Sequence, residues 1–288
     1  MNTAIQTGAR VDVRPERDRL LTDPVHCGEA ARALAQGVVI GHGFANFYAI
    51  TARADRDSVR RVNLMKGRPP AQVGSITVPP SGIPELFDWN ALPSGLTRRS
   101  VLGVIDTFYG MGPFGFRGPA AAHLPEHLSF VEDGVRTAQL VAPGYACPSN
   151  QFLARSLDAT GDDLLYITSA NRSRHLTGAD DTPAHWRAAG LRIDFGHEPE
   201  FTLLEHEDED AARAAYPRFQ PMSTTILSFH RLGTDPGDPR PQLVLDRHGS
   251  LHVSDVRQVL DRLGFGLALG PRAGSRLPLR AYPVSAGI

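Results

Sequence analysis

Short apolar runs and helical repeats of apolar residues follow one another along most of the chain. Apolar runs between turn-forming residues are typical of buried strands, and apolar positions spaced by three and four residues are typical of amphipathic helices. We therefore expect strands at 38–40, 48–51, 73–78, 101–105, 164–167, 224–229 and 242–245. We expect helices at 24–36, 56–65 and 150–160, around Trp186 after a cap at Asp181, and at 255–263 after a cap at Ser254.

The alternation of these elements predicts one α/β domain with a mixed sheet, because no break in the pattern divides the chain into two halves. Residues 1–22 are polar and rich in arginine without a clear period, so we expect a flexible N-terminal arm. The domain is expected to cover residues 23–268. Residues 269–288, rich in Gly, Pro and Arg, are expected to form a C-terminal tail.

Composition narrows the class of protein. Of the 288 residues, 41% are hydrophobic and 21% charged, which is ordinary for a packed chain and excludes disorder of the whole protein. No apolar run is long enough to span a membrane, and no apolar segment follows the N-terminal arginines as in a secretory signal. Two cysteines, Cys27 and Cys147, are too few for a disulfide framework. We expect a cytoplasmic protein with two reduced thiols.

Lysine occurs once. The net charge is −1, so no global positive field attracts nucleic acid, and all but one of the 30 basic residues are arginine. The exception, Lys66, stands with Arg68 in the segment Lys66-Gly67-Arg68-Pro69 at the expected end of a helix. An ammonium and a guanidinium two residues apart can converge on one polyanion. The two residues are therefore our candidate catalytic cations.

Hydroxyl and amide side chains gather beside two expected strands. Thr168, Ser169 and Asn171 follow the strand at 164–167, and Ser223 and Thr224 stand at the start of the strand at 224–229. The carboxyl ends of strands in open α/β sheets face the ligand crevice. There these groups can hydrogen-bond phosphates or a nucleobase edge, so we assign them as candidate nucleotide-binding residues.

Two other motifs do not support a site. Residues 110–115 match the glycine pattern of dinucleotide-binding folds, but the glycines and prolines that follow predict no helix at the third glycine. His123 and His127 are four residues apart, but Pro125 between them argues against a helical metal site. We expect no metal-ligand cluster.

Taken together and in this order, the basic and hydroxyl segments resemble the YrdC-like family of threonylcarbamoyl-AMP synthases. The family has a K-x-R-P segment, here at 66–69, a T-S-A-N-x-S segment, here at 168–173, and a later strand–Arg–Gly turn, here at 245–249. Residues 43–55 resemble its P-T-D-T-x-Y-G-L segment. The resemblance implies a twisted, open mixed α/β sheet flanked by helices, with a concave, positively lined face.

The resemblance also implies an activity. Members condense threonine, bicarbonate and ATP into threonylcarbamoyl-AMP for the modification of tRNA to threonylcarbamoyladenosine, and some bind double-stranded RNA. Mg²⁺ is expected with ATP. By this resemblance Lys66 and Arg68 would hold phosphates and the amino-acid carboxylate, Thr168, Ser169, Asn171, Ser223 and Thr224 would hold the nucleotide, and Asn46 and Tyr48 would contact the amino acid.

The departures from the family pattern fall on the amino-acid side. The P-T-D-T segment reads Gly43-Phe44-Ala45-Asn46, which removes the expected threonine-binding hydroxyl. Two alternatives therefore stay open. The first is a carbamoyl-adenylate enzyme with another acceptor, and the second is a homologue that binds nucleotide or double-stranded RNA without catalysis.

Overall fold

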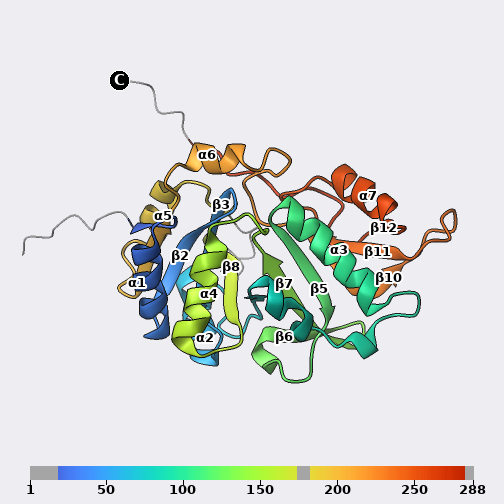
Figure 1. Ribbon diagram of the computed structural model, residues 1–288, viewed down its shortest axis with the longest axis horizontal. Coiled ribbons are helices and arrows are strands. Elements are labelled where there is room, and N and C mark those ends of the chain that lie inside the picture. The colour runs from blue at the N-terminus through green and yellow to red at the C-terminus, as the bar shows by residue number, and fades with distance from the viewer. Residues whose placement is uncertain (1–18, 174–181, 283–288) are drawn as a thin grey trace, which may run out of the picture.

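A mixed sheet of twelve strands runs through the part of the chain that the computed structural model describes, residues 19–173 and 182–282 (Figure 1). Its strands are β1 (Arg19–Leu20), β2 (Val39–Phe44), β3 (Phe47–Arg53), β4 (Ser75–Thr77), β5 (Phe114–Pro119), β6 (Ser129–Glu132), β7 (Val135–Ala142), β8 (Leu165–Ser169), β9 (Phe201–Glu205), β10 (Ile226–Gly233), β11 (Gln242–Arg247) and β12 (Gly266–Leu269). They are hydrogen-bonded in the order β1-β9-β2-β3-β8-β4-β7-β5-β10-β11-β12, and β6 pairs with β7.

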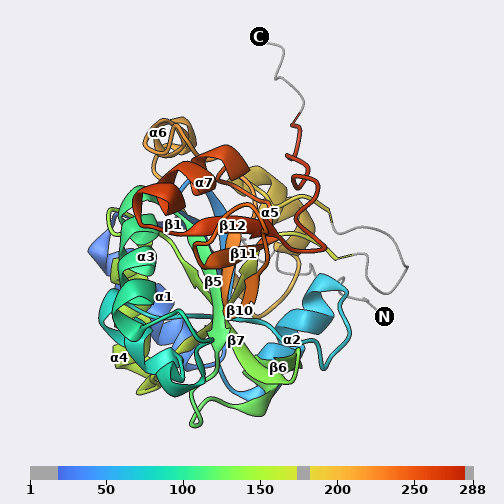
Figure 2. The same cartoon turned by 90° about the vertical axis from the view of Figure 1, so that its right-hand side faces the viewer.

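Helices connect and cover the strands. They are α1 (Pro24–Ala35), α2 (Arg56–Lys66), α3 (Arg98–Met111), α4 (Ser149–Thr160), α5 (Ala188–Phe195), α6 (Glu209–Ala214) and α7 (Val253–Arg262), with short 3₁₀ turns at Pro80–Leu86, Trp89–Ala91 and Glu126–Leu128. Seen along the sheet, α1, α3 and α4 lie on one side and α2 and α5 on the other (Figure 2). The expected twisted mixed sheet flanked by helices is confirmed.

Strand pairing positions the polar segment that follows β8. The antiparallel pairs β2–β3, β3–β8 and β8–β4 place the end of β8 in the middle of the sheet, where Ser169 is opposite Ala49. On the other side of β4, the parallel pair β5–β10 places Ile226 opposite Gly115. The two segments rich in hydroxyl groups therefore begin at neighbouring parts of one sheet although they are far apart in sequence.

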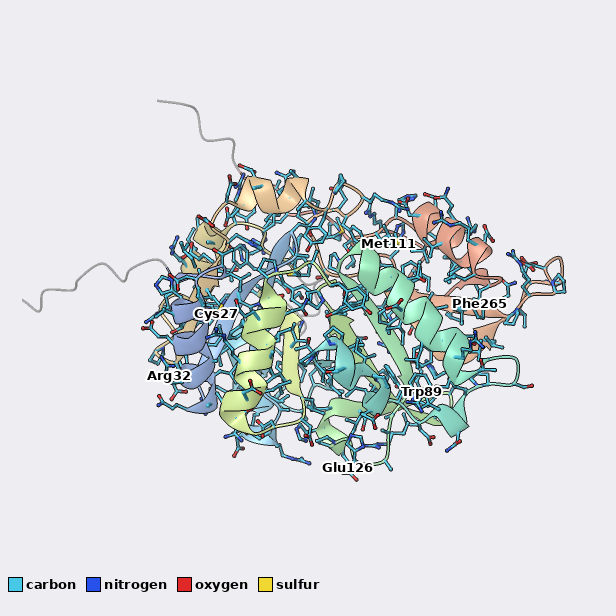
Figure 3. The ribbon with its side chains drawn as sticks, in the orientation of Figure 1. Cys27, Arg32, Trp89, Met111, Glu126 and Phe265 are labelled. Carbon is cyan, nitrogen blue, oxygen red and sulfur yellow. The ribbon has the colours of Figure 1, made fainter. Side chains whose placement is uncertain are left out.

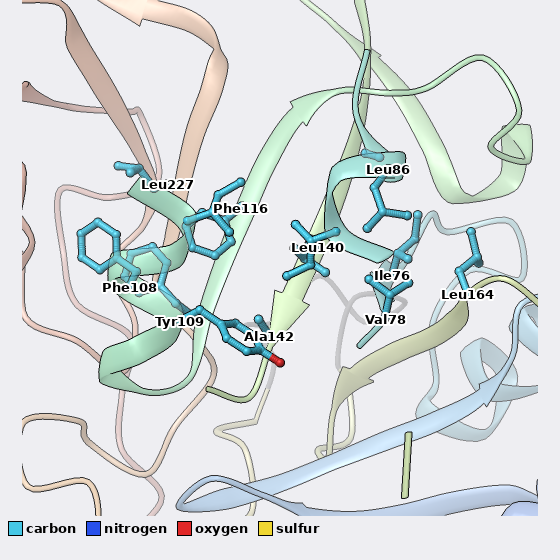
Figure 4. Packing of buried hydrophobic residues seen from close by; sticks show 14 of the residues in the cluster. Ile76, Val78, Leu86, Phe108, Tyr109, Phe116, Leu140, Ala142, Leu164 and Leu227 are labelled. Carbon is cyan, nitrogen blue, oxygen red and sulfur yellow. The ribbon is translucent and has the colours of Figure 1, made fainter. Parts of the chain in front are cut away.

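The largest core cluster includes residues of the central strands and of the helices α2, α3, α5 and α7. Phe108 on α3 stacks on Phe114 of β5 with 4.3 Å between ring centroids, and both side chains are fully buried. Figure 4 shows Phe116 beside α3, and Leu140 near Ile76 and Leu86. Burying one such side chain contributes about 1.5–3 kcal/mol, so these contacts stabilise the packing of the helices on the sheet.

The strand expected at 101–105 is wrong. This segment lies inside α3, which begins at a capping box formed by Thr97 and Ser100. Val101, Val104, Ile105 and Phe108 are buried, and their spacing of three and four residues is helical. The β-branched residues in 101–105 are typical of a strand, but the apolar spacing of three and four residues continues to Phe108 and indicates a helix.

Smaller corrections concern caps and ends. The helix expected around Trp186 begins two residues later, at Ala188, and Asp181 lies outside the described residues. His252, not Ser254, caps α7. Of the expected N-terminal arm, Arg19–Leu20 form β1 and Leu21 is buried, so the sheet already includes this part of it.

The glycine pattern at 110–115 covers the end of α3 and the start of β5, so no helix begins at its third glycine, as expected. Among the described residues, no helix has the length and apolar character needed to cross a membrane.

His42 is a fully buried, titratable member of the sheet. Its Nδ1 lies 2.9 Å from the Gly43 carbonyl oxygen and its Nε2 lies 2.7 Å from Thr51 Oγ1, an arrangement that satisfies the neutral ring. Burial lowers the pKa of His42 from 6.5 to about 4. Between these two pH values the unfolded chain binds a proton that the folded chain does not, so the free energy of unfolding falls as the pH falls.

We predict that His42→Gln makes the protein less sensitive to acid. On going from pH 7 to pH 4.5 in urea titrations, the free energy of unfolding should drop by about 2 kcal/mol less in the variant than in the parent, since one pKa unit corresponds to about 1.4 kcal/mol. Other buried histidines contribute equally to both proteins. Equal drops in the two proteins would contradict the assignment.

Candidate functional site

The end of α2 and the segment after β8 meet at Lys66. Gly67, at φ 74°, ends α2 in the left-handed region that glycine adopts without strain. The fully buried Lys66 side chain donates from Nζ to the Ser169 carbonyl oxygen and to Asn171 Oδ1, the latter at 3.3 Å. The Ser173 backbone N–H donates to the Lys66 carbonyl oxygen at 2.7 Å. The structure thus brings together the lysine and the turn that the sequence singled out separately.

The Arg68 side chain lies beside this junction and lines an open cavity. Its Nη1 donates to Thr168 Oγ1 at 2.8 Å, and the residue is 8% exposed. Ser169 Oγ donates to Asn171 Oδ1 at 2.6 Å, which fixes the amide beside Lys66. Arg68, Thr168 and Ser169 line the cavity, whereas Lys66 and Asn171 lie buried behind the wall. Lys66 and Asn171 therefore hold the site in shape from behind.

The cavity has a volume of about 360 Å³, which lies within the range of small-molecule sites. Its charged lining residues are four arginines and one aspartate: Arg68, Arg117, Arg247, Arg272 and Asp246. Ser223 and Thr224, from the segment before β10, form the opposite wall. Of the nine residues proposed from sequence, five line this one cavity.

The wall formed by Ser223 and Thr224 depends on Gly249. Arg247 donates from Nε to the Thr224 carbonyl oxygen at 2.7 Å and from Nη2 to Thr224 Oγ1 at 2.9 Å. A Cβ atom at Gly249 would lie 2.2 Å from the Ser223 carbonyl oxygen. Only glycine lets the turn after β11 approach the segment before β10 this closely.

Arg117 is the most buried of the lining arginines, at 5% exposed. It pairs with Asp246 at 2.9 Å and with Glu132 at 3.0 Å, and donates to Gln139 Oε1 at 2.6 Å. Asp246 accepts a second pair from Arg231 at 2.9 Å. The single carboxylate of the lining is thus shared between Arg117 and Arg231.

Crowding of like charges defines the electrostatics of the cavity. Burial, together with the neighbouring guanidiniums of Arg117, Arg68 and Arg272, lowers the pKa of Arg247 to about 9. Arg247 stays charged near pH 7, but its charged form is less favourable here than in water. A bound polyanion would compensate the crowded cations, and such a ligand is the one that this arrangement favours.

The two residues proposed for the amino acid lie elsewhere. Asn46, in the turn between β2 and β3, donates from Nδ2 to the Phe219 carbonyl oxygen at 2.8 Å, and the Tyr48 hydroxyl donates to Glu209 Oε1 at 2.9 Å. The cavity is lined in this region by Phe44, Phe47 and Ala49. The structure therefore does not bring Asn46 and Tyr48 to the five lining residues.

A C-terminal segment that sequence reasoning left as a tail crosses this region. The Leu277 N–H donates to the His248 carbonyl oxygen at 2.9 Å, and Arg280 Nε donates to the Pro183 carbonyl oxygen at 2.7 Å. Trp186 Nε1 donates to the Arg280 carbonyl oxygen at 2.9 Å. In this segment Arg272 and Leu277 line the cavity. In the sequence, the arginine content of residues 269–288 was the one feature that indicated a role for this segment.

Arg117 and Arg247 were also missed as site residues. Each lies on a strand among apolar residues, and a chain with so many arginines does not reveal which of them converge. No group of three or more His, Cys, Asp or Glu side chains among residues 19–173 and 182–282 is arranged to hold a metal ion. Cys27 and Cys147 are buried thiols whose pKa values are raised by burial.

Comparison with known proteins supports the fold. No family model matches the sequence, and no curated protein is significantly similar to it. Among solved structures, P. abyssi Sua5 complexed with L-threonine superposes with a TM-score of 0.59 at 17% identity, over 90% of this chain and 66% of that one. The chain thus spans about two thirds of the length of that Sua5.

Two further structures share the fold. A hypothetical protein from Streptococcus mutans UA159 superposes with a TM-score of 0.58 at 17% identity, over 84% of this chain and 94% of that one. Full-length HypF in a phosphate- and nucleotide-bound form gives 0.51 at 12% identity, over 77% of this chain and 28% of that one. The chain has the fold of Sua5 and YrdC-family proteins, as its motifs predicted.

We predict that Arg272→Gln weakens the binding of inorganic tripolyphosphate about 3- to 10-fold in calorimetric titrations, because a partly solvated charge-assisted hydrogen bond is worth roughly 1 kcal/mol. Arg272 is exposed and its loss removes no buried contact. Arg99→Gln, an exposed arginine outside the cavity lining, is the matched control and should leave the affinity unchanged. Equal affinities in both variants would show that the cavity is not the anion site.

Proposed function

We propose that this chain is a nucleotidyltransferase of the threonylcarbamoyl-AMP synthase type, using ATP, bicarbonate and an amino acid. The observation that carries the proposal is the convergence of Arg68, Arg247 and Arg272 with the hydroxyls of Ser169 and Thr224 around one cavity. Guanidinium groups bind the oxygens of a triphosphate through charge-assisted hydrogen bonds, and hydroxyls suit the sugar and base. The fold shared with Sua5 is consistent with this reading.

The proposed reaction needs no covalent protein intermediate. The amine of the amino acid takes up bicarbonate with loss of water to form a carbamate, whose oxygen then attacks the α-phosphorus of ATP. The bond to the β-phosphate breaks and pyrophosphate leaves. Arg68 and Arg247 would stabilise the charge that develops on the phosphates, and the rigid wall at Ser169 would orient the nucleotide.

Mg²⁺ is expected with ATP as its counter-ion. A site without a carboxylate cage suits Mg²⁺ held by phosphate oxygens and water, the arrangement that this cation commonly adopts. When bound, the ion would neutralise part of the triphosphate charge. The protein residues would contribute position and the remaining positive charge.

A different acceptor is the second candidate. Where the resemblance implies a threonine-binding hydroxyl, the cavity wall is formed by Phe44, Phe47 and Ala49, and Asn46 is turned to Phe219. Such a wall suits an amine or amino acid with an apolar side chain better than threonine. We expect ATP and bicarbonate to be shared by both candidates and the protein to act in the cytoplasm.

Pyrophosphate release measured with a panel of amino acids and amines tests the two candidates. Release that depends on threonine supports the first, and release that depends on an apolar acceptor supports the second. ATP binding without release under any condition would leave a nucleotide-binding homologue. Affinity for tRNA or double-stranded RNA that falls steeply with salt would then identify an RNA ligand.

We predict that Lys66→Ala lowers the rate of pyrophosphate release by on the order of 10²-fold or more, because the Ser169–Asn171 turn that orients the nucleotide loses its support. Since Lys66 is buried, thermal melting must show that the variant folds. Arg68→Lys keeps the charge but not the fork that reaches Thr168, and should lower the rate by a smaller factor. Unchanged rates in folded variants would reject both roles.

A further inference from the structure

A second cavity, of about 530 Å³, opens at the C-terminal end of α3 and shares no lining residue with the first. Figure 3 shows Met111 at this end of α3, on the side where α6 lies. The loop at 144–148 and the segment from His206 to Tyr216 complete the wall. It includes Gly110-Met111-Gly112 of the glycine pattern, which has no place in the proposed reaction.

Aromatic rings form much of this wall. Tyr109, Tyr145 and Tyr216 line it with Met111, and the rings of Tyr109 and Tyr145 lie edge to face with 4.4 Å between centroids. The Tyr109 hydroxyl donates to Asn150 Oδ1 at 2.9 Å and the Tyr145 hydroxyl donates to Asp106. Both hydroxyls are engaged within the protein and the Tyr109 ring is fully buried, so Tyr145 and Tyr216 provide the accessible aromatic surface. Tyr145 is half exposed, so the wall is reachable from solvent.

The charges at this cavity have the opposite sign to those of the first. Glu207 and Asp208 are its carboxylates, and its lining contains neither arginine nor lysine. Backbone N–H groups of Asp210 and Ala211 donate to Asp208 and lower its pKa, so this carboxylate stays ionised. Burial lowers the pKa of His206, which leaves that ring neutral near pH 7.

Small residues keep the space open. The wall contains Ala45, Ala146, Ala211, Ala212 and Ala215, besides glycines. At its base the backbones of Gly112 and Gly144 touch: a Cβ at Gly144 would lie 2.8 Å from the Gly112 Cα, and Gly144 has φ 94°. A side chain at either position would clash with its neighbours and strain the backbone, so this close approach requires glycine at both.

We propose that this second cavity binds a small organic cation, an alkylammonium group with an apolar body. The negative face of an aromatic ring attracts such a cation through the ring quadrupole, and quaternary ammonium groups are commonly held in this way. Tyr145 and Tyr216 are the tyrosines of this wall that keep exposed surface. Glu207 and Asp208 add the counter-charge at the rim. A nucleotide is repelled by the same carboxylates, so the site is independent of the proposed reaction.

Calorimetric titration with choline and with its neutral isostere 3,3-dimethylbutan-1-ol tests the proposal on the full chain. The two probes have almost the same shape and differ in charge. We expect saturable binding of choline and at least 10-fold weaker binding of the neutral probe. Absence of choline binding, or equal binding of both probes, would overturn the proposal.

Variants assign the binding to this cavity. Ala212→Phe should fill it and abolish choline binding. Glu207→Gln with Asp208→Asn should weaken binding at least 10-fold, and asparagine keeps the helix cap that Asp208 provides. The control Asp210→Asn removes a neighbouring carboxylate that does not line the cavity and should bind choline like the parent. Undiminished binding in the folded Ala212→Phe and double variants would place the cation elsewhere and refute the assignment.

Discussion

The buried ammonium of Lys66 joins two parts of the chain that would otherwise end in separate loops. Its hydrogen bonds to the Ser169 carbonyl oxygen and to Asn171 hold the end of α2 against the turn after β8. A buried cation is unfavourable unless such acceptors surround it, so the loops are constrained to this one arrangement. Arg68 and Thr168 take their positions at the cavity from this junction.

Positive charges are crowded in the cavity beside this junction. The sheet forces Arg117, Arg247 and the carboxylate of Asp246 close together, and Asp246 is already shared between Arg117 and Arg231. The neighbouring guanidiniums lower the pKa of Arg247 beside these hydroxyl groups. A bound polyanion would offset this repulsion and stabilise the folded protein. The second cavity has the opposite charge, since its lining contains carboxylates and aromatic rings but neither arginine nor lysine.

The sequence predicted those site residues that stand together in short segments of the chain. The segment at 66–69, the hydroxyls at 168–169 and Ser223-Thr224 could be found because residue types and strand ends coincide, and the structure brings all of them to one region. The α/β class followed from periodicity. The segment at 101–105 was misread because a few β-branched residues satisfy both periods until the buried face is extended to Phe108.

What could not be predicted depends on long-range packing. Arg272 looks like the other arginines in the sequence, and Arg247 was noted only as part of the strand–Arg–Gly turn at 245–249 and given no role. The pairing of β10 with β11 and the path of the C-terminal segment bring the two residues to the cavity. Asn46 and Tyr48 were assigned by resemblance alone, and their hydrogen bonds to Phe219 and Glu209 place them away from it. Their proposed contact with the amino acid stays a prediction.

The decisive experiment is a crystal structure of the full chain grown with ATP. We expect the triphosphate to lie among Arg68, Arg247 and Arg272, with the nucleoside against the Ser169 and Thr224 walls and the Lys66 contacts unchanged. Nucleotide bound outside this cavity, or a cavity still empty at saturating ATP, would contradict it.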